Sequence, residues 1–322
     1  MLHFFELADG RLSRQREPVL GERTVWIDLV EPTAEEDAMV ERALGVEVLT
    51  RDEAREIEAS SRLYRENGVP YMTAYVVYNA DSEVPDGATV TFILAAKRLV
   101  TLRYHDPKAF PIYAARAGRG EVDCATAPQI LVGILETIID RAADRIERSQ
   151  DEIEKIARNV FGTKPGSRKY TQRLDVVLRS IGRQGDITAR LEESAFSLER
   201  LLAFLATYLR EQGVTPEILA RIEVAQRDVR SLADQMRFLM DRTTFLLDAT
   251  LGAISIEQNK SMKIFSVLAA TLMPPTLVAA IYGMNFKHMP ELDWLYGYPM
   301  ALLIMILAGL VPYLIFRWRG WI

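Results

Sequence analysis

The sequence predicts an α+β domain arranged as an α/β/α sandwich, then a long helical hairpin and a stalk helix that runs into a two-helix transmembrane hairpin. Three observations support this fold class. Residues 1–124 alternate β-rich and helical segments, residues 125–263 repeat apolar side chains at helical spacing, and residues 264–322 hold only two acidic and three basic side chains. The 322-residue chain has a mean hydropathy of only +0.02, so its apolar residues are concentrated at one end. We expect three parts with these bounds.

The first part contains the signals of a mixed domain. Residues Val25–Leu29 predict a strand, and a Thr33-x-x-Glu36 capping box then predicts a helix that ends near Leu44. Its 22 acidic and 15 basic side chains indicate a solvated acidic surface, with cation binding by part of it as the alternative. The other predicted strands are Tyr71–Tyr78, Thr89–Ala95 and Val100–Arg103, the last two forming a hairpin.

Composition excludes several classes of function. The single cysteine, Cys124, allows no intrachain disulfide, and with only three histidines the chain has no Cys/His zinc site; we expect Cys124 to be a small buried residue. A net charge of −5 without a basic tract argues against nucleic acid as a partner. No phosphate loop, dinucleotide motif or catalytic constellation is found, so an enzyme is not expected.

The second part predicts an antiparallel helical hairpin and a stalk helix. Helical spacing runs from Pro128 to Val160, breaks at Gly162–Ser167 and resumes over Leu174–Leu209. One further helix is predicted from Pro216 to Tyr282, which is 67 residues or about 100 Å at ~1.5 Å per residue. Its apolar and small residues recur with a mean spacing near 3.5, which predicts self-association of the stalk, with packing against its own hairpin as the alternative. These residues are Leu219, Ile222, Ala225, Val229, Leu232, Met236, Leu239, Thr243, Leu246, Thr250 and Ala253.

Two uncharged runs predict the membrane hairpin. Ile264–Met284 has 21 residues, Trp294–Phe316 has 23, and the polar loop between them is too short to hold a domain. A pair of buried helices in a soluble core is the alternative. Basic residues precede the first span and follow the second, so we expect both termini in the cytoplasm and the spans in the cell inner membrane. The basic residues are Lys260, Lys263, Arg317 and Arg319, and the aromatic residues expected at the interfaces are Trp294, Tyr296, Tyr298, Trp318 and Trp321.

The N-terminus does not predict a signal peptide, because Met1–Leu7 is short, lacks a basic region and contains His3 and Glu6. We therefore expect the chain before the spans to stay in the cytosol.

The first span has one stripe of small or weakly polar residues, which serves either tight helix packing or contact with water. Pro274-Pro275 interrupts the helical hydrogen bonds, which a membrane tolerates where a neighbour or a cavity satisfies the freed carbonyls. The second span, rich in Leu and Ile over Ala301–Leu310, is expected to face lipid. The stripe consists of Ser266, Ala269, Met273, Thr276, Ala280 and Gly283.

At the end of the first span stands Tyr282-Gly283-Met284-Asn285-Phe286, within the longer string YGMNFKHMPELDW. With a second span and a basic tail behind it, this segment resembles the CorA family of divalent-cation channels over essentially the whole chain. The resemblance implies a homopentameric funnel, in which five copies of the first span line a pore. It implies no cofactor other than Mg²⁺ as the transported and regulatory ion.

The resemblance also implies site residues. Gly283, Met284 and Asn285 form the selectivity motif, where neutral oxygen acceptors suit an ion that gives up its waters reluctantly, and Gly283 allows the backbone to open. Phe265 stands where a Leu can occur and Ala280 where a Gly can, and rings of Met262 and Phe265 would exclude water when the pore is closed. The implied pore-lining residues are Asn259, Met262, Phe265, Met273, Thr276 and Ala280.

Acidic residues complete the implied site. Asp248 matches a stalk position at which a carboxylate helps to bind regulatory Mg²⁺ between subunits, and an ordinary solvated acid is the alternative. Its partner acid from the first part is Asp81, Glu83 or Asp86. The loop acids Glu291 and Asp293 are expected to raise the local cation concentration without selecting among ions.

We therefore predict a channel for Mg²⁺ influx, with Co²⁺ and Ni²⁺ as further ions, gated by intracellular Mg²⁺. A zinc transporter of the ZntB type is the alternative within transport. A membrane-anchored coiled-coil scaffold is the alternative outside it, and it would explain the long helix but not the Gly-Met-Asn end or the stripe.

Overall fold

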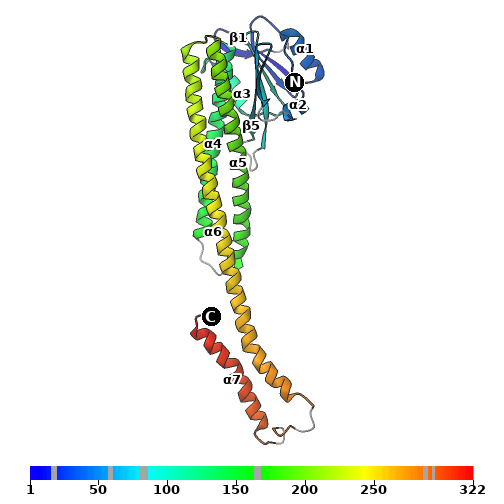
Figure 1. Cartoon of the computed structure of the whole chain (residues 1–322), viewed down its shortest axis with the longest axis vertical. Helices are drawn as coiled ribbons and strands as arrows, with labels where there is room; N and C mark the ends of the chain where they lie inside the picture. The colour runs from blue at the N-terminus through cyan, green and yellow to red at the C-terminus, as the bar shows by residue number, and fades with distance from the viewer. Residues whose placement is uncertain are drawn as a thin grey trace. The chain divides into compact units, whose positions relative to one another are not determined.

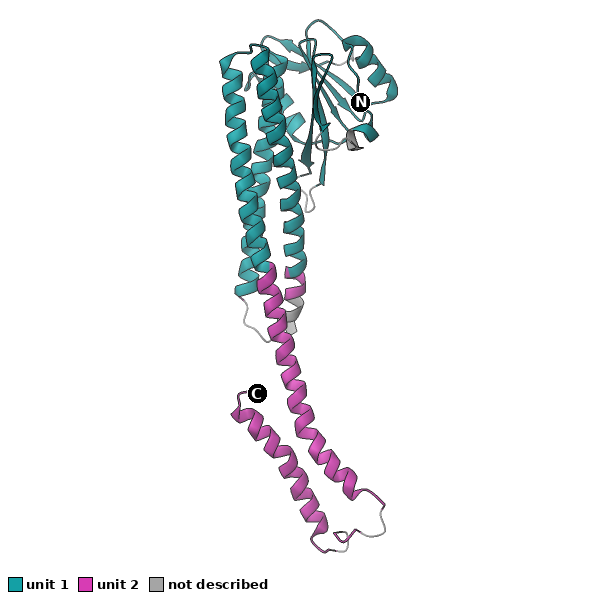
Figure 2. Cartoon of the chain, viewed as in Figure 1, with its two compact units in different colours: residues 1–161, 178–246 teal, residues 162–177, 247–322 magenta. Residues whose placement is uncertain are grey.

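The computed structural model describes residues 1–15, 20–56, 61–79, 86–162, 168–285, 289–291 and 294–321. The chain forms two compact units (Figure 2): residues 1–161 with 178–246, and residues 162–177 with 247–322. This division by contacts differs from the three-part division of the sequence, because two helices, α5 (Arg168–Glu211) and α6 (Pro216–Tyr282), contribute to both units.

The first unit contains a seven-stranded sheet with the order β2-β1-β3-β7-β6-β5-β4. Strands β3 and β7 pair in parallel and the other neighbours are antiparallel. All four predicted strands are present, whereas β1, β2 and β4 were not predicted. The bounds are β1 (Leu2–Ala8), β2 (Arg11–Arg14), β3 (Thr24–Val30), β4 (Leu63–Glu66), β5 (Val69–Tyr78), β6 (Asp86–Ala95) and β7 (Arg98–Arg103).

Helices cover both faces of the sheet, so the predicted α/β/α sandwich is confirmed (Figure 1). On one face lie α1 (Ala34–Leu44) and α2 (Arg51–Glu56), and the predicted capping box of α1 forms between Thr33 and Glu36. On the other face lie α3 (Ala109–Arg119) and the start of α4 (Ala127–Phe161), where Trp26 contacts the rings of Phe110 and Tyr113.

A buried ion pair lies in the middle of the sheet. Arg103 donates to both carboxylate oxygens of Asp28, at 3.0 Å and 2.9 Å, and both side chains are at least nine-tenths buried. Thr101 donates a third hydrogen bond to Asp28 at 2.7 Å, and the Trp26 indole donates to Thr101 at 2.9 Å. These partners compensate the cost of burying two charges.

The edge of β5 is closed by a helix. Strand β4 pairs only with residues 69–72 of β5, which leaves the main chain of Tyr75 facing away from the sheet. Ser197 of α5 (Arg168–Glu211) accepts from the Tyr75 N–H at 2.9 Å, and Ser194 donates to the Tyr75 carbonyl at 3.0 Å. Two side chains of α5 thus replace a neighbouring strand, which removes an open sheet edge.

Helices α4, α5 and the first part of α6 pack side by side within the first unit (Figure 1). Ion pairs join α6 to both neighbours, from Arg221 to Glu136 of α4 at 2.6 Å and from Arg230 to Glu199 of α5 at 2.8 Å. The predicted apolar seam of α6 is largely buried here by the chain's own helices, which accounts for its spacing without self-association. The buried members in this unit are Ile222, Ala225, Val229, Leu232, Met236, Leu239, Thr243 and Leu246.

The second unit contains the start of α5, the rest of α6, and α7 (Gly297–Trp318). Helices α6 and α7 each carry an apolar stretch long enough to cross a membrane, and only 6% of each stretch is buried within the chain. This exposure contradicts the alternative of a buried helical pair in a soluble core, which would be covered by other parts of the chain. At the basic end of the pair, Lys263 lies 5.9 Å from the centre of the Trp321 ring, which places the start of the first span beside the end of the second.

Candidate functional site

The membrane part of α6 has one side that packs against α7. Val267 is buried on this side, and Thr271, Pro275 and Val278 are half-buried. A Cβ atom at Gly309 of α7 would lie 3.2 Å from the Pro275 side chain, which shows how closely the two helices approach. The sequence analysis did not single out Gly309, although a glycine within a Leu- and Ile-rich span is the usual signal of a close helix contact.

The predicted pore-lining residues lie on the other side of α6. At 100° per residue their mean direction is about 165° from that of Val267, Thr271 and Val278. The chain's own second span therefore does not cover these residues, and they lie free for another partner or for water. All six are exposed in the single chain: Asn259, Met262 (63%), Phe265 (70%), Met273 (68%), Thr276 and Ala280.

Two hydroxyl groups on this stripe bond to their own helix. Ser266 Oγ donates to the Met262 carbonyl at 2.9 Å, and Thr276 Oγ1 lies 3.1 Å from the Leu272 carbonyl and 2.8 Å from the Met273 carbonyl. A hydroxyl group has one proton and two lone pairs. With the proton engaged on the helix, each oxygen presents its acceptor side outward, which is the polarity that the water shell of a cation requires.

The double proline lies at the contact with α7. Pro274 and Pro275 have no N–H, so the carbonyls of Ala270 and Thr271 lose their helical donors. The Thr271 oxygen would lie 3.3 Å from a Cβ at Gly309, so the α-carbon of that glycine sits next to the freed carbonyl. A Cα–H group is a weak donor to a carbonyl. The second span thus supplies the neighbour that the sequence analysis required.

The Gly-Met-Asn motif follows directly after α6. The Gly283 N–H donates to Ala279 at 3.0 Å and the Met284 N–H to Ile281 at 3.2 Å, so the helical hydrogen bonding continues through the first two motif residues. Gly283 is not among the described glycines with positive φ, so it keeps a backbone conformation that is open to other residues in this structure. Asn285 is exposed at the end of this turn, with its carboxamide accessible.

The outer loop is described only in part. Glu291 is exposed in a turn, and Asp293 lies outside the described residues. The carbonyl of Glu291 approaches Gly297, at the start of α7, so closely that a Cβ there would clash with it. Gly297 therefore fixes the path by which the loop enters α7.

The acids expected to bind regulatory Mg²⁺ have different surroundings. Asp248 is exposed on α6. Asp86, at the start of β6, pairs with Arg190 at 2.8 Å and accepts from the Tyr78 hydroxyl at 3.1 Å. A hydrogen bond from the Gly87 N–H is the main cause that lowers the pKa of Asp86. Asp81 and Glu83 lie outside the described residues, and the described part of the chain contains no cluster of three or more metal-ligating side chains. Of the three candidate partners, Asp86 is the one that the structure describes, and its carboxylate is already engaged by Arg190.

A sequence profile of the family described as "CorA-like Mg2+ transporter protein" matches residues 21–318. The chain belongs to the CorA family. It is 36% identical to the magnesium transport protein CorA of Escherichia coli strain K12 over 326 residues, and 34% identical to that of Mannheimia succiniciproducens over 324 residues, each match covering 100% of both chains. CorA of Methanocaldococcus jannaschii has the same fold, with a TM-score of 0.76 at 17% identity over 100% of this chain and 99% of that structure.

Membership in the CorA family agrees with the geometry. The family's motif stands where α6 ends, and the two apolar helices follow each other at the C-terminal end of the chain. The expectation drawn from the Gly-Met-Asn string is therefore confirmed at the level of the family.

Proposed function

We propose that this protein is a homopentameric channel of the inner membrane through which Mg²⁺ enters the cell down its electrochemical gradient. The observation that carries the proposal is the exposed stripe on α6, which lies opposite the α7 contact and leads to Asn285. Five copies that turn this stripe inward would line a pore and leave α7 toward lipid. The magnesium transport named for the relatives at 34% and 36% identity supports the same ion.

The stripe fits the transport of a hydrated divalent cation. Mg²⁺ keeps its waters, so a ring of neutral oxygens can hold its shell without binding it too tightly to release it. Asn285 supplies such oxygens at the mouth, and Thr276 supplies them within the span. An inside-negative potential provides about 2.3 kcal/mol per charge for each 100 mV, and twice that for a divalent ion. The membrane potential therefore suffices to drive the flux without nucleotide hydrolysis.

Two apolar side chains would close this pathway. Met262 and Phe265 are exposed on the same side of α6 as the stripe, near the cytoplasmic end of the span. Rings of such side chains can stop ions by excluding water from a narrow pore. We assign the gate to these two residues.

Intracellular Mg²⁺ would control the gate through Asp248. This carboxylate is exposed, and the structure gives it no ion pair among the residues that it describes. An ion held between Asp248 and an acid of a neighbouring subunit would favour the closed assembly, to the extent that it binds that state more tightly.

The loop acids Glu291 and Asp293 would attract cations to the outer mouth. Exposed charges act over about 8–10 Å in physiological salt, so this contribution is expected to fade as the salt concentration rises. Neutralising both residues should then lower flux mainly at low ionic strength. An effect that persists in high salt would instead indicate direct coordination.

Transport of Zn²⁺ and assembly as a scaffold were the alternatives from the sequence, and the comparisons favour neither. The names of the curated relatives favour Mg²⁺ over Zn²⁺, and the exposed stripe favours a pathway over a scaffold. We expect purified protein in liposomes to pass Mg²⁺, with Co²⁺ and Ni²⁺ as further ions. Preferred Zn²⁺ flux would favour the zinc transporter, and the absence of any flux from assembled protein would favour the scaffold.

The substitution Asn285→Ala tests the mouth. It removes an exposed carboxamide and little packing, so the oligomer should assemble normally while selective Mg²⁺ flux is lost. Light scattering of the purified oligomer is the control for assembly. Wild-type flux from a correctly assembled Asn285→Ala protein would contradict the assignment.

A further inference from the structure

The first unit contains a cavity that the ion pathway does not use. It has a volume of about 880 Å³ and lies where the start of β3, the turn between β6 and β7, the first turn of α4 and the turn between α5 and α6 meet. Ligand sites for small molecules span about 300–1,000 Å³. The cavity is therefore large enough for an organic ligand.

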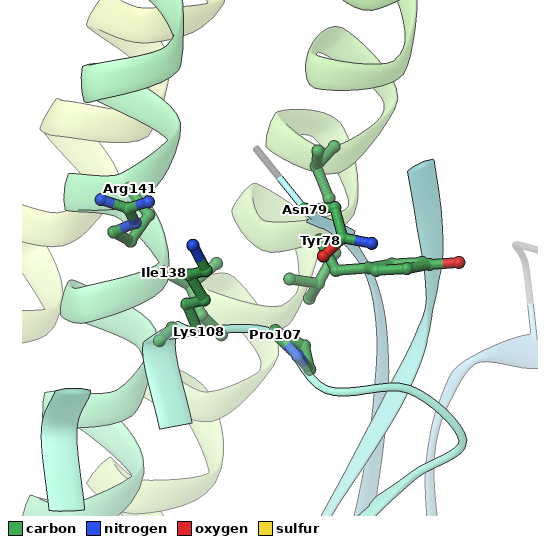
Figure 3. A pocket seen from close by; sticks show the side chains of 9 residues that line it. Tyr78, Asn79, Pro107, Lys108, Ile138 and Arg141 are labelled. Carbon is green, nitrogen blue, oxygen red and sulfur yellow. The ribbon is translucent and has the colours of Figure 1, made fainter. Parts of the chain in front are cut away.

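A second hollow shows the contrast. Figure 3 shows the space bounded by Tyr78 and Asn79 at the end of β5, by Pro107 and Lys108, and by side chains of α4. Its volume is about 20 Å³, which is enough for a single water molecule. It offers no room for an organic ligand.

The larger cavity has an apolar wall. Leu209 near the end of α5 and Ile218 at the start of α6 are buried there, and Val25 and Leu94 of the sheet are half-buried beside them. Apolar groups on a ligand would gain from contact with this wall at about 25 cal/mol for each Å² removed from water.

The charged groups of the cavity favour an anion. Arg98 is half-buried and held in place by two main-chain oxygens, with Nε donating to Thr24 at 3.0 Å and Nη2 donating to Gly21 at 3.2 Å. No carboxylate pairs with Arg98 among the described residues, so its charge is fixed but not neutralised. Lys97 adds a second positive charge and Glu22 one negative charge, which leaves the lining with a net charge of +1.

We propose that this cavity binds a small organic anion with an apolar body, its carboxylate or phosphate group against Arg98 and Lys97 and its body against the half-buried Val25 and Leu94. A preset guanidinium binds such a head group well, because a charge-assisted hydrogen bond is about twice as strong as a neutral one and no rearrangement is needed. The ligand would contact α5 and α6 at the turn that joins them. The proposal does not depend on the ion pathway and could fail without affecting it.

The experiment uses the full-length protein in nanodiscs of zwitterionic lipid and fluorine NMR of a matched pair of probes. The anion 4-(trifluoromethyl)benzoate should show saturable line broadening, whereas the neutral 4-(trifluoromethyl)benzamide should bind at least about tenfold more weakly, as expected when a charged hydrogen-bond partner is lost. Empty nanodiscs correct for partition into lipid.

Three variants locate the site. Lys97→Gln, at an exposed position, and Arg98→Gln should each weaken benzoate binding, and Ile218→Trp should block it by filling the cavity. Arg119→Gln removes an exposed arginine elsewhere and should leave binding unchanged. Circular dichroism shows which variants are folded, and Lys97→Gln keeps the test decisive if Arg98→Gln unfolds. Equal binding of the two probes, or unchanged benzoate binding in folded Lys97→Gln and Ile218→Trp proteins, would overturn the proposal.

Discussion

The α-carbon of Gly309 on α7 faces the main-chain oxygen of Thr271 on α6, the oxygen that Pro275 leaves without a helical donor. A side chain at position 309 would begin 3.3 Å from that oxygen and 3.2 Å from the Pro275 ring. In hydrocarbon no water can satisfy a freed carbonyl, so a close neighbour has to do so. The two spans are therefore matched at one point, with the prolines on one helix and the glycine on the other.

Gly309→Leu should separate the two spans. The added side chain has no space at this contact, and overpacking of this kind costs about 1–3 kcal/mol. We expect a lower midpoint of thermal unfolding of the protein in nanodiscs. Val311→Trp, a large substitution at an exposed position of the same helix, is the control. If both variants melt together with the wild type, the close contact at Gly309 is not important for stability.

Thr276→Val should reduce Mg²⁺ flux, because it replaces a hydroxyl on the exposed stripe by a methyl group of similar size. Thr271→Val makes the same change on the side that faces α7 and should leave flux unchanged. Flux into liposomes is measured for both at matched protein content. Equal losses in the two variants would show that the stripe has no special role.

Asp248→Ala should release the channel from inhibition by internal Mg²⁺. Patch-clamp currents titrated with Mg²⁺ on the cytoplasmic side should persist at concentrations that silence the wild type. The variant should also lose part of the Mg²⁺ protection of α6 against proteolysis. Superimposable inhibition curves for variant and wild type would refute a sensing role for Asp248.

Asp28→Ala should destabilise the first unit by about 3–5 kcal/mol, because it leaves Arg103 buried without its main counter-charge. The double variant Asp28→Leu with Arg103→Met should recover most of this loss, since it removes both charges. Chemical denaturation followed by circular dichroism gives the free energies of unfolding. Glu121→Ala breaks an exposed ion pair with Arg119 and should cause no measurable change. If Asp28→Ala is as stable as the double variant, the buried charge of Arg103 does not destabilise the first unit.

The first unit should lose stability between about pH 6.5 and pH 4 because of His105. Burial is the main cause that lowers the pKa of His105 to about 4, the charge of Arg103 adds to it, and Asp106 and Asp86 oppose it. Neither ring nitrogen has a hydrogen-bond partner among the described residues. The folded state therefore binds the proton more weakly than the unfolded state. The contribution of neutral His105 to the free energy of unfolding is complete above pH 6.5 and is lost as the pH falls toward 4.

His105→Phe tests this pH dependence, because it keeps a ring against Tyr78 and removes the titrating group. The free energy of unfolding of the variant should fall less steeply than that of the wild type between pH 6.5 and pH 4. Burial also lowers the pKa of His3, which leaves a smaller slope in the variant. Parallel curves for the two proteins would exclude His105 as a source of the slope.

The long helices were predictable because their signals repeat many times. Helix α6 has the predicted bounds, and α4 differs from its prediction by one residue at each end. Helix α5 begins at Arg168 and ends at Glu211, so the predicted bounds of Leu174 and Leu209 were too narrow. The short strands were harder. In Leu2–Ala8 the adjacent Phe4 and Phe5 break the alternation of apolar and polar residues. The segment becomes a strand because it lies beside β3 and shares its core. Helix α3 contains Pro111 and Gly118, which hide its helical pattern, and it forms where Phe110 and Tyr113 pack against Trp26.

The candidate site was predictable in part for a similar reason. Helical spacing alone places Ser266, Met273 and Thr276 on one side of α6, so the stripe could be identified from the sequence. Met262 and Phe265 were named only from the family resemblance. Which side faces α7 depends on Gly309 and the double proline, which are far apart in the sequence and meet only in the fold. The partner proposed for Asp248 would belong to another subunit, and no local pattern of the sequence encodes such a pairing.

The bonding of Ser266 and Thr276 has a consequence for the sign of the ions that can pass. Each hydroxyl donates its only proton to a carbonyl of its own helix. These two side chains therefore present lone pairs to the pathway and no hydrogen-bond donor. Chloride needs donors to replace its water shell and would find none there, whereas the waters around a cation point their protons outward. This part of the pathway would thus reject anions without carrying any charge. Because a hydroxyl does not titrate in the physiological range, the rejection would be the same at every pH in which the protein is folded.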